Sequence, residues 1–553
     1  MQLIDRRIGF IFAVFLALLA IGATKAAWLG VVKADSLQRA ASVQQEADIT
    51  IPAQRGSIED ANGIDLSVSE PSMDIAATPR LVTDATKAAA KLAPIIDRDE
   101  TKILQSLARR DTQFVYLGRG IPAEKAKQAR KLKIPGLEFI PDYRREYPLD
   151  WTASQLLGSV GTDGNGLSGL EYTFEKQLRG SAGQRQLVKD AMGEALEIRD
   201  TKPVEPGKNV TLTLDANLQD QAEEVLAEVG EKWKPKGATA IVMDPHSGAL
   251  LALANWPRVN ANEPGKSPPE ANTNRAVATN YEPGSTFKAF TVAAALEEGK
   301  VTPETSFSIP SVYTYADREL RDAEDLGMGS MTVGEILKHS SNIGAVKIAG
   351  ALGGSKPFDK WIHRFGFGKA TGVDLPGEQI GQVLPLDKYS GATMGNLPIG
   401  QGISVTAMQM MAAYAAIANG GVLRPPHIVD KVGGKTVKKK PGKRILSEAT
   451  TASVRKMLEG VIGTGGTAAG AEIPGYTTAG KTGTAEKAIN GEYSKEFYVA
   501  SFVGFAPAKH PKLLAAVVVD EPKGEIYGGQ VAAPAWRQIV NFALGYLKIG
   551  PKG

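Results

Sequence analysis

The segment Glu282-Pro-Gly-Ser-Thr-Phe-Lys288 leads directly into an apolar stretch, Ala289–Leu296, that we expect to be helical. A serine at a helix start with a lysine three residues later places Ser285 Oγ and Lys288 Nζ on the same helix face. An unaided serine hydroxyl is a poor nucleophile and needs an adjacent base. A lysine can be that base when burial or a neighbouring cation lowers its pKa. The segment therefore predicts a nucleophile, Ser285, paired with a base, Lys288.

Ser-x-x-Lys alone is a weak signal, because ordinary residue frequencies produce it about twice in a chain of this length. A second copy, Ser453-Val-Arg-Lys456, is indeed present. It lies within a charged helical stretch and no glycine turn precedes it, so we interpret it as a solvent-exposed helix face.

A second motif, Ser340-Ser-Asn342, follows the predicted helix Thr332–His339. In isolation it is typical of a helix terminus, where Ser and Asn are favoured. It can also carry chemistry, because the Ser340 hydroxyl could relay protons between a lysine and a substrate nitrogen. The Asn342 side chain offers one acceptor and two donors, enough to hold an amide and orient a lysine.

A third motif, Lys481-Thr-Gly-Thr484, lies in a strand-like segment. A strand edge with a cation, two hydroxyls and a glycine can dock a peptide terminus as an added strand. Lys481 would supply charge for a carboxylate, and Thr482 and Thr484 would supply hydroxyl donors. Gly483 lacks the side chain that would block close approach.

The same segment fits a phosphate-loop pattern, Gly475-Tyr-Thr-Thr-Ala-Gly-Lys-Thr482. A phosphate loop should follow a buried strand and open into a helix whose N-terminus binds the anion. Here Glu472-Ile-Pro-Gly precedes the pattern and an apparent loop follows it. We therefore reject nucleotide binding.

The amino-acid composition excludes several other classes of function. A hydrophobic fraction of 43% and a charged fraction of 22% are those of a globular protein with a real core. The net charge of +4 gives no reason to expect nucleic acid, and we interpret the basic run 435–444 as a solvated loop. The absence of cysteine excludes disulfides, thiolate catalysis and Cys-ligated zinc. Five histidines without metallohydrolase spacing predict no metal site.

The N-terminus predicts a membrane anchor at residues 1–33. Arg6 and Arg7 precede two apolar runs, 8–23 and 26–32, which together reach the roughly 20 residues that a spanning helix needs. Lys25 lies between the runs and can snorkel to the interface. The two arginines predict a cytoplasmic N-terminus and an exported body, and no other segment is long and apolar enough to span. The alternative is a signal peptide cleaved near the small residues around Ala26.

Beyond the anchor the chain divides in two on composition. Residues 46–205 are rich in charge and show no catalytic constellation, which is typical of a positioning or partner-docking domain. Its expected elements are helices at Thr83–Leu92, Glu100–Ala108 and Ala123–Leu132, and a strand with turns at Leu156–Gly166.

Residues 206–548 have the pattern of a catalytic α+β domain with an antiparallel sheet flanked by helices. Its expected elements are a strand at Val210–Leu214, a helix at Ala216–Val229, a hairpin formed by residues 238–243 and 249–254, and a strand pair at Tyr498–Phe505 and Leu513–Val519.

The order and spacing of the three motifs resemble those of the serine penicillin-recognising enzymes, which include the β-lactamases. Ser340 follows Ser285 by 55 residues, and Lys481 follows Ser340 by 141 residues. Nearly the whole chain resembles the class B penicillin-binding proteins, with Ala61 as one departure where that family more often has Arg. The matching blocks are Arg55-Gly-Ser-Ile-Glu-Asp-Ala-Asn-Gly, Arg145-Glu-Tyr-Pro, Gly169-Leu-Glu, Leu178-Arg-Gly-Ser-Ala-Gly, Leu212-Thr-Leu-Asp, Asp244-Pro-His-Ser-Gly, Asn274-Arg-Ala and Gly400-Gln-Gly-Ile-Ser-Val-Thr-Ala-Met-Gln.

This resemblance implies a D,D-transpeptidase that cross-links peptidoglycan through a serine acyl-enzyme and needs no cofactor. It implies that Lys288 deprotonates Ser285, which attacks the penultimate D-Ala carbonyl of a stem peptide, and that Ser340 passes a proton to the departing D-Ala. Asn342 would hold the donor amide. β-Lactams, which mimic the D-Ala-D-Ala terminus, would acylate the same serine.

The resemblance also implies how the substrate is held. Lys481, Thr482 and Thr484 would bind its terminal carboxylate, beside Gly483. Backbone N–H groups of Ser285 and Thr484 would form the oxyanion hole.

Several alternatives stay open at this point. A secreted β-lactamase would need a deacylating base and no anchor. A D,D-carboxypeptidase would transfer the acyl group to water instead of an amine. A catalytically silent scaffold would not need the intact motifs. The resemblance further implies partners in the membrane, a glycan polymerase and divisome proteins, with a septal role favoured over elongation.

Overall fold

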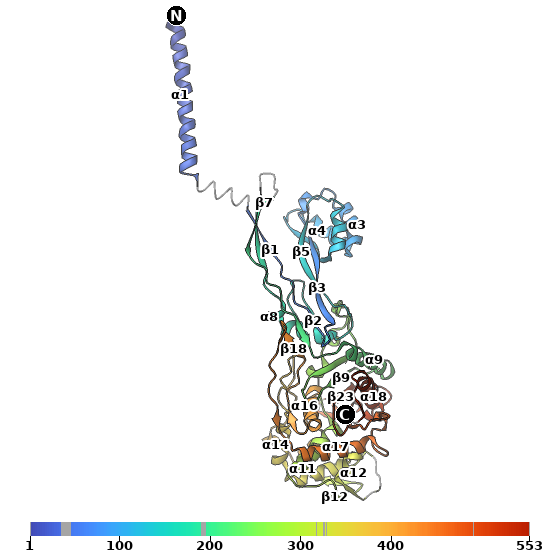
Figure 1. The fold of residues 1–553 in the computed structure, drawn as a ribbon. Helices are drawn as coiled ribbons and strands as arrows, with labels where there is room; N and C mark the ends of the chain where they lie inside the picture. Colours follow the sequence, from blue (N-terminus) through green and yellow to red (C-terminus); the bar gives the residue numbers. More distant parts are fainter. Residues whose placement is uncertain are drawn as a thin grey trace.

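The computed structural model describes residues 2–34, 46–189, 195–316, 318–323, 327, 329–489 and 491–551 (Figure 1). The predicted spanning segment forms a single helix, α1 (Gln2–Val31). Its Arg6–Val31 portion has a mean hydropathy of 2.2 and is the one helix in the described part of the chain long and apolar enough to cross a membrane.

The region that follows is built on long strands (Figure 1). β1 (Glu46–Ile51), β6 (Gly183–Lys189) and β7 (Ala195–Lys202) form an antiparallel three-stranded sheet. β3 (Asp65–Ala77) pairs with both β4 (Val115–Pro122) and β5 (Leu137–Glu146).

Three helices at the far end of these strands form a head with a hydrophobic core of its own, drawn from residues 73–139. They are α3 (Ala85–Ile96), α4 (Glu100–Ala108) and α5 (Ala123–Arg130), which confirms the three predicted helices. Side chains of Asp84 and Asp99 accept hydrogen bonds from the first turns of α3 and α4, so the sequence itself marks where these helices begin.

The expected strand at Leu156–Gly166 is wrong in its first part. Residues Ser154–Leu157 form a helical turn, α6, and an isolated bridge joins Val160 to Gly166. Leu156 and Leu157 are each 1% exposed. Adjacent residues of a strand point to opposite faces, whereas a helical turn here buries both leucines against one core.

The catalytic domain contains the predicted antiparallel sheet, in the order β10-β9-β23-β22-β21. The predicted hairpin is present as β9 (Gly237–Met243) and β10 (Leu250–Trp256). The predicted strand pair is present and longer, as β22 (Glu492–Ala506) and β23 (Leu513–Asp520), and β21 (Ala479–Ile489) ends the sheet.

Helices cover both faces of this sheet. α9 (Ala216–Trp233), predicted to end at Val229, packs against α18 (Gly528–Tyr546) and the strands beneath them. α10 (Arg275–Ala278) and α16 (Ala407–Ala418) contact β9, and α16 also contacts β23.

The remaining short helices and strands of the described chain connect these elements. They are η1 (Pro79–Leu81), α7 (Gly169–Thr173), α8 (Glu175–Leu178), η2 (Pro264–Lys266), η3 (Pro269–Asn272), β11 (Asn280–Tyr281), η4 (Gly284–Phe287), α11 (Lys288–Glu297), β12 (Ser306–Ser308), β13 (Tyr313–Tyr315), β14 (Arg318–Leu320), β15 (Ser330–Thr332), α12 (Val333–Lys338), α13 (Asn342–Ala351), α14 (Ser355–Arg364), η5 (Leu386–Lys388), α15 (Thr393–Asn396), η6 (Leu397–Ile399), β16 (Val405–Thr406), β17 (Val422–Leu423), β19 (Lys435–Thr436), β20 (Lys443–Arg444), α17 (Glu448–Ile462) and η7 (Ala469–Ala471).

A second sheet joins the two halves of the chain. β8 (Val210–Leu212), shorter than predicted, pairs with β18 (Val429–Val432) on one side and with β2 (Ile58–Glu59) on the other. β2 in turn pairs with β3, so the strands of the front region and those of the catalytic domain share hydrogen bonds.

A buried ionic cluster lies beside this junction. Glu171, fully buried, accepts hydrogen bonds from Arg55 Nε at 2.6 Å and from Arg145 Nε at 2.7 Å. Arg55 also pairs with Glu175 at 2.5 Å, and Ser67 Oγ donates to Glu171 at 2.9 Å. Three sequence blocks that are more than a hundred residues apart at their extremes therefore meet at one carboxylate.

We expect Glu171→Ala to lower the free energy of unfolding by about 3–5 kcal/mol, because it removes the buried carboxylate that two buried arginines share, and only Arg55 keeps a second carboxylate, that of Glu175. Urea unfolding of the purified chain measures this. Asp200→Ala is the matched control, since its ion pair with Arg185 is exposed and its loss should cost less than about 1 kcal/mol. Equal changes for the two variants would contradict the structural role of the cluster.

Candidate active site

Ser285 lies on a tight turn that presents its side chain at the surface while burying its neighbours. It is partly exposed, whereas Thr286 and Phe287 are buried. Gly284 adopts a φ of 53°, and its N–H donates to the carbonyl of Gly400 at 3.0 Å. The hydroxyl of the fully buried Tyr414 donates to the carbonyl of Thr286 at 2.6 Å. The turn is therefore held from two sides before α11 begins.

Lys288 is 1% exposed, and its Nζ donates three hydrogen bonds, all to the second motif. The acceptors are Ser340 O at 2.5 Å, Ser340 Oγ at 3.2 Å and Asn342 Oδ1 at 2.7 Å. The structure thus brings together the first two predicted motifs. Burial lowers the pKa of Lys288 to about 7, while the negative charge of Asp322 acts in the opposite direction. A general base is most effective when its pKa is near the working pH.

The second motif lies between two helices, as its sequence indicated. α12 ends at Lys338, and α13 begins at Asn342 with Ser341 as its cap, whose Oγ accepts from Gly344 N at 2.9 Å. Ser340 adopts a φ of 60°, a conformation that is unfavourable for a residue with a side chain. This conformation accompanies the 2.5 Å contact between its carbonyl and Lys288 Nζ.

The third motif lies on β21, the last strand in the sheet order, facing the nucleophile turn. Lys481 is fully buried, and burial, reinforced by the nearby Lys288, holds its pKa well below the usual lysine range. Within the described residues its hydrogen-bond acceptors are Thr482 O and Thr482 Oγ1, both 3.4 Å from Nζ. Lys481 therefore keeps most of its donor capacity for a ligand.

The two threonines of this motif already hold structural partners. Thr482 Oγ1 lies 2.9 Å from Thr467 Oγ1, and Thr484 Oγ1 accepts from Gly528 N at 3.1 Å. The Thr484 hydroxyl hydrogen is still able to serve as a donor to a ligand.

Gly483 is required by the packing of the site itself. A Cβ at this position would lie 2.4 Å from Ser501 Oγ and 2.9 Å from the carbonyl of Pro283. Only glycine lets β21 approach the nucleophile turn this closely. The sequence indicated room for a peptide, and the structure adds this second reason.

The secondary structure decides how the second Ser-x-x-Lys copy and the phosphate-loop pattern should be interpreted. Ser453 and Lys456 lie within α17, and the Lys456 side chain is 80% exposed and paired with Glu459 at 2.8 Å. The phosphate-loop pattern leads into β21, which continues as a strand to Ile489. The exposed-helix interpretation of the first is confirmed, and the second lacks the helix that a phosphate loop opens into. Within the described ranges, no group of three or more His, Asp or Glu side chains could hold a metal ion.

Asp322 is a residue of this site that the sequence did not reveal. Its Oδ1 accepts hydrogen bonds from Asn342 N at 2.6 Å and Ile343 N at 3.0 Å, at the start of α13. The carbonyl of the adjacent Arg321 accepts from Asn342 Nδ2 at 3.0 Å. The Asn342 side-chain amide is therefore fixed at both of its polar atoms, because Oδ1 accepts from Lys288 Nζ and Nδ2 donates to the Arg321 carbonyl. Nothing in the spacing of this segment signals that it returns to the site.

Glu282 is a second residue that the sequence did not identify as functional. Its Oε1 accepts from Gly402 N at 3.1 Å and from Tyr493 Oη at 3.3 Å. It therefore ties the residues just before the nucleophile to the loop after η6 and to the β21–β22 hairpin.

Comparison with known proteins covers nearly the whole chain. Residues 238–541 match the family described as penicillin binding protein transpeptidase domain, and residues 50–212 match the penicillin-binding protein dimerisation domain. The stage V sporulation protein D of Bacillus subtilis is 34% identical over 99% of this chain and 87% of its own length. The peptidoglycan D,D-transpeptidase FtsI of Escherichia coli is 32% identical over 99% of this chain and 93% of its own. A crystal structure of penicillin binding protein 3 from Mycobacterium tuberculosis, complexed with aztreonam, superposes with a TM-score of 0.71 at 27% identity, covering 91% of this chain and 98% of that one.

The charge of Asp322 should set the pH at which Lys288 becomes a base. Lys288 is active when neutral, so reaction of Ser285 with a penicillin should rise as pH passes through about 7. Because Asp322 stabilises the protonated lysine, Asp322→Asn should move this rise to lower pH while keeping a hydrogen-bond acceptor for α13. The pH profile of the second-order acylation rate measures the shift.

The matched control is Asp387→Asn, which removes a carboxylate at an exposed position. It should leave the profile unchanged. A rise at unchanged or higher pH in Asp322→Asn would contradict the role of this charge.

Proposed function

Because the chain belongs to the class B penicillin-binding proteins, we propose that Ser285 is the nucleophile with which it cross-links peptidoglycan stem peptides. The chain is a peptidoglycan D,D-transpeptidase and a target of β-lactams. The observation that carries the residue assignment is the buried Lys288, which shares hydrogen bonds with the Ser340 and Asn342 side chains one helical turn from Ser285.

In the first half-reaction, neutral Lys288 takes the hydroxyl proton of Ser285, and Oγ attacks the penultimate D-Ala carbonyl carbon. Backbone N–H groups of Ser285 and Thr484 stabilise the oxyanion. Collapse of the tetrahedral intermediate breaks the peptide bond. The departing D-Ala amine receives its proton through Ser340, whose Oγ is 3.2 Å from Lys288 Nζ.

In the second half-reaction, an amine of a neighbouring stem peptide attacks the acyl-enzyme carbonyl. The amine loses a proton, the ester bond to Ser285 breaks, and the proton returns to Oγ through Lys288. The free enzyme is restored with one new amide bond and no cofactor is consumed.

The third motif recognises the substrate. Lys481, with Thr482 and Thr484, binds the terminal carboxylate, and Gly483 keeps β21 close to the turn. The weak 3.4 Å contacts of Lys481 support this role, because a buried ammonium group needs a strong partner. Asn342 holds the donor amide.

The location of the enzyme follows from α1, which supports a single-pass membrane anchor. We place the N-terminus in the cytoplasm because Arg6 and Arg7 precede the apolar stretch. We assign residues 1–33 to the anchor, 46–205 to a non-catalytic pedestal and 206–548 to the transpeptidase domain.

Penicillin labelling tests the nucleophile. Ser285→Ala should abolish covalent labelling by a fluorescent penicillin, because it removes the hydroxyl that lies one helical turn before the buried base, Lys288. Ser453→Ala is the matched control and should label as wild type does, since it changes the other Ser-x-x-Lys copy. Labelling that survives in Ser285→Ala would overturn the assignment.

A septal role, with the pedestal contacting a membrane-embedded glycan polymerase and divisome proteins, is the finer part of the proposal. The similarity to FtsI over 99% of the chain supports it. Depletion of the protein should give filaments with unfinished septa, scored by microscopy. Round, swollen cells that still divide would place the protein in elongation instead.

A further inference from the structure

The basic run 435–444, expected as a solvated loop, belongs to a longer basic segment of the catalytic domain. Residues 424–444 hold eight Lys and Arg residues and one acidic residue, so the formal charge of this segment is +7. The whole chain has a net charge of +4, and the remainder of it is therefore net negative. The exposed cations of the segment are Lys431, Lys435, Lys438, Lys440, Lys443 and Arg444.

Two antiparallel strand pairings fold this segment back on itself beside the junction sheet. β18 pairs with β19 across the turn Gly433-Gly434, and β20 pairs with β17. Lys208, an exposed residue just before β8, packs its side chain against that turn, since a Cβ on Gly433 would lie 3.2 Å from Lys208 Cδ. A cation from a distant part of the sequence therefore joins the segment. We call Lys208 and the six exposed cations of 424–444 the basic surface.

Acidic side chains compensate little of the charge on the basic surface. Lys431 lies 3.8 Å from Asp430, and Arg444 lies 3.4 Å from Glu448. Among the described residues, the other lysines of the basic surface form no ion pair. The half-buried Arg424 adds an Nε that has no hydrogen-bond partner within the described part of the chain. Most of the positive charge is therefore available to an external anion.

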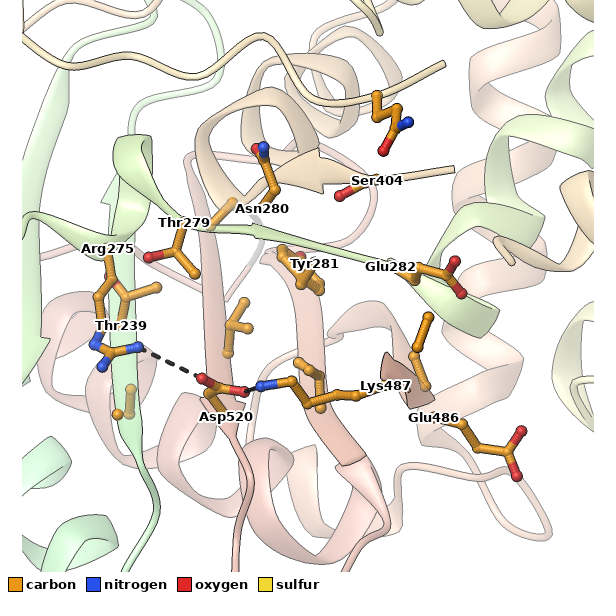
Figure 2. Close-up of a pocket in the computed structure, with 18 residues that line it drawn as sticks. Thr239, Arg275, Thr279, Asn280, Tyr281, Glu282, Ser404, Glu486, Lys487 and Asp520 are labelled. Atoms are coloured by element: carbon orange, nitrogen blue, oxygen red, sulfur yellow. Dashed lines mark hydrogen bonds and ion pairs between the residues drawn. The ribbon is translucent and has the colours of Figure 1, made fainter. Parts of the chain in front are cut away.

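Cations that line a cavity of the same domain are instead paired internally. Figure 2 shows Asp520 between two of them, 2.7 Å from Lys487 Nζ and 3.5 Å from Arg275 Nη1. Lys487 also donates to Glu521 at 2.6 Å. These cations have their counter-charge within the protein, whereas the basic surface takes its counter-charge from solution or from a partner.

The side chains of the basic surface favour an extended polyanion over a folded protein. Protein interfaces are enriched in aromatic residues and Arg and depleted in Lys, but this surface has six lysines and one arginine. Residues 424–444 expose no large hydrophobic side chain. Lysine is a flexible point charge and lacks the planar fork with which Arg fixes one orientation of its ligand. The surface therefore suits repeated negative charges on a flexible polymer.

The position of the basic surface separates it from the membrane. In Figure 1, β18 lies beside α8, at the opposite end of the pedestal strands from the beginnings of β1 and β7. The chain leaves the anchor before β1, and β1 alone spans about 20 Å at the usual rise of a strand. Salt screens exposed charges over about 8 Å at physiological ionic strength. The headgroups around the anchor therefore act only weakly on the basic surface.

We propose that the basic surface binds an anionic polymer of the cell wall, one that carries phosphate or carboxylate groups at intervals along its chain. Its lysines contact successive negative groups, and binding releases the counterions of the polymer, so the affinity falls steeply with salt. Attachment to such a polymer keeps the catalytic domain close to the wall that holds its substrate. The proposal rests on the extracytoplasmic location of this domain and is independent of the nucleophile assignment.

The test is binding of fluorescently labelled inorganic polyphosphate to the full-length chain in detergent, followed by fluorescence anisotropy at increasing NaCl. The logarithm of the affinity should fall linearly with the logarithm of the salt concentration, and dextran, a neutral polymer, should not bind. The variant Lys435→Gln/Lys438→Gln/Lys440→Gln should bind at least about tenfold more weakly. The magnitude of its salt slope should drop by about 2, at roughly 0.7 for each lost contact.

The matched control is Lys87→Gln/Lys91→Gln/Lys102→Gln, which removes the same net charge from exposed positions in the pedestal head. It should bind polyphosphate as wild type does. Equal weakening in the two triple variants would show that net charge alone drives binding and would overturn the proposal. Dextran binding as tightly as polyphosphate would overturn it too.

Polygalacturonate, a carboxylate polymer, separates the two possible kinds of charge. Tighter binding of polyphosphate assigns phosphate groups to the natural polymer, and tighter binding of polygalacturonate assigns carboxylates. Failure of wild type to bind either polymer refutes the proposal. Thermal melting establishes that each variant is folded. If the triple variant is not, Lys435→Gln and Lys440→Gln decide singly, each with a salt slope smaller by roughly 0.7, and unchanged slopes contradict the proposal.

Nanodiscs test the membrane as the competing partner. At physiological salt, wild type in phosphatidylcholine nanodiscs should bind polyphosphate as tightly as in nanodiscs that also contain phosphatidylglycerol. Weaker binding beside phosphatidylglycerol would place the basic surface on lipid headgroups and exclude the wall polymer. Penicillin labelling of Lys435→Gln/Lys438→Gln/Lys440→Gln should match wild type, because these lysines lie outside the active site. Absence of labelling in wild type would refute the nucleophile assignment and leave the polymer result standing.

Discussion

The burial of two lysine side chains close together is the constraint on which the catalytic site depends. Lys288 and Lys481 are 1% and 0% exposed, and the charge of Lys288 adds to burial in lowering the pKa of Lys481. A buried ammonium group is stable only if it is paired or gives up its charge. Among the described residues, Lys288 has three oxygen acceptors and no carboxylate as a direct hydrogen-bond partner, and Asp322 acts on it through its charge alone. This partial compensation suits Lys288 to its proposed role as a base near neutral pH.

In the pedestal, by contrast, the buried charges are paired directly with opposite charges. Arg55 and Arg145 share one fully buried carboxylate, Glu171, at 2.6 and 2.7 Å, and the pairing is direct. Such a cluster fixes geometry, because each arginine is paired directly with a carboxylate. The junction sheet formed by β2, β8 and β18 lies in the same region, so the cluster stabilises the place where the pedestal and the catalytic domain share strands. Buried charge thus stabilises the structure of the pedestal, whereas in the catalytic site it adjusts the pKa values of the lysines.

The sequence predicted the elements and motifs whose signal is local. The hairpin of β9 and β10 and the helix α9 were predictable because hydrophobic periodicity indicates them. The contact of Lys288 with the second motif spans 52 residues, and it was expected from the order of the motifs and the family resemblance. Asp322 was not readable, because its contact with α13 depends on how the loop after β14 returns to the site. Leu156 and Leu157 were misassigned because two adjacent buried leucines fit a strand or a helical turn equally well in sequence. The packing reason for Gly483 depends on Pro283, nearly two hundred residues earlier, and no local pattern contains it.

The two lysines also explain why substrate binding and base activation belong together. In the free site, burial and the nearby Lys288 hold the pKa of Lys481 well below the usual lysine range. A substrate carboxylate at Lys481 favours the protonated form of that lysine. The positive charge of Lys481 in turn disfavours a proton on Lys288, which leaves Lys288 neutral and able to accept the proton of Ser285. With the residue roles proposed above, a carboxylate bound by the third motif helps to prepare the base of the first motif, and the nucleophile is activated when a substrate is in place.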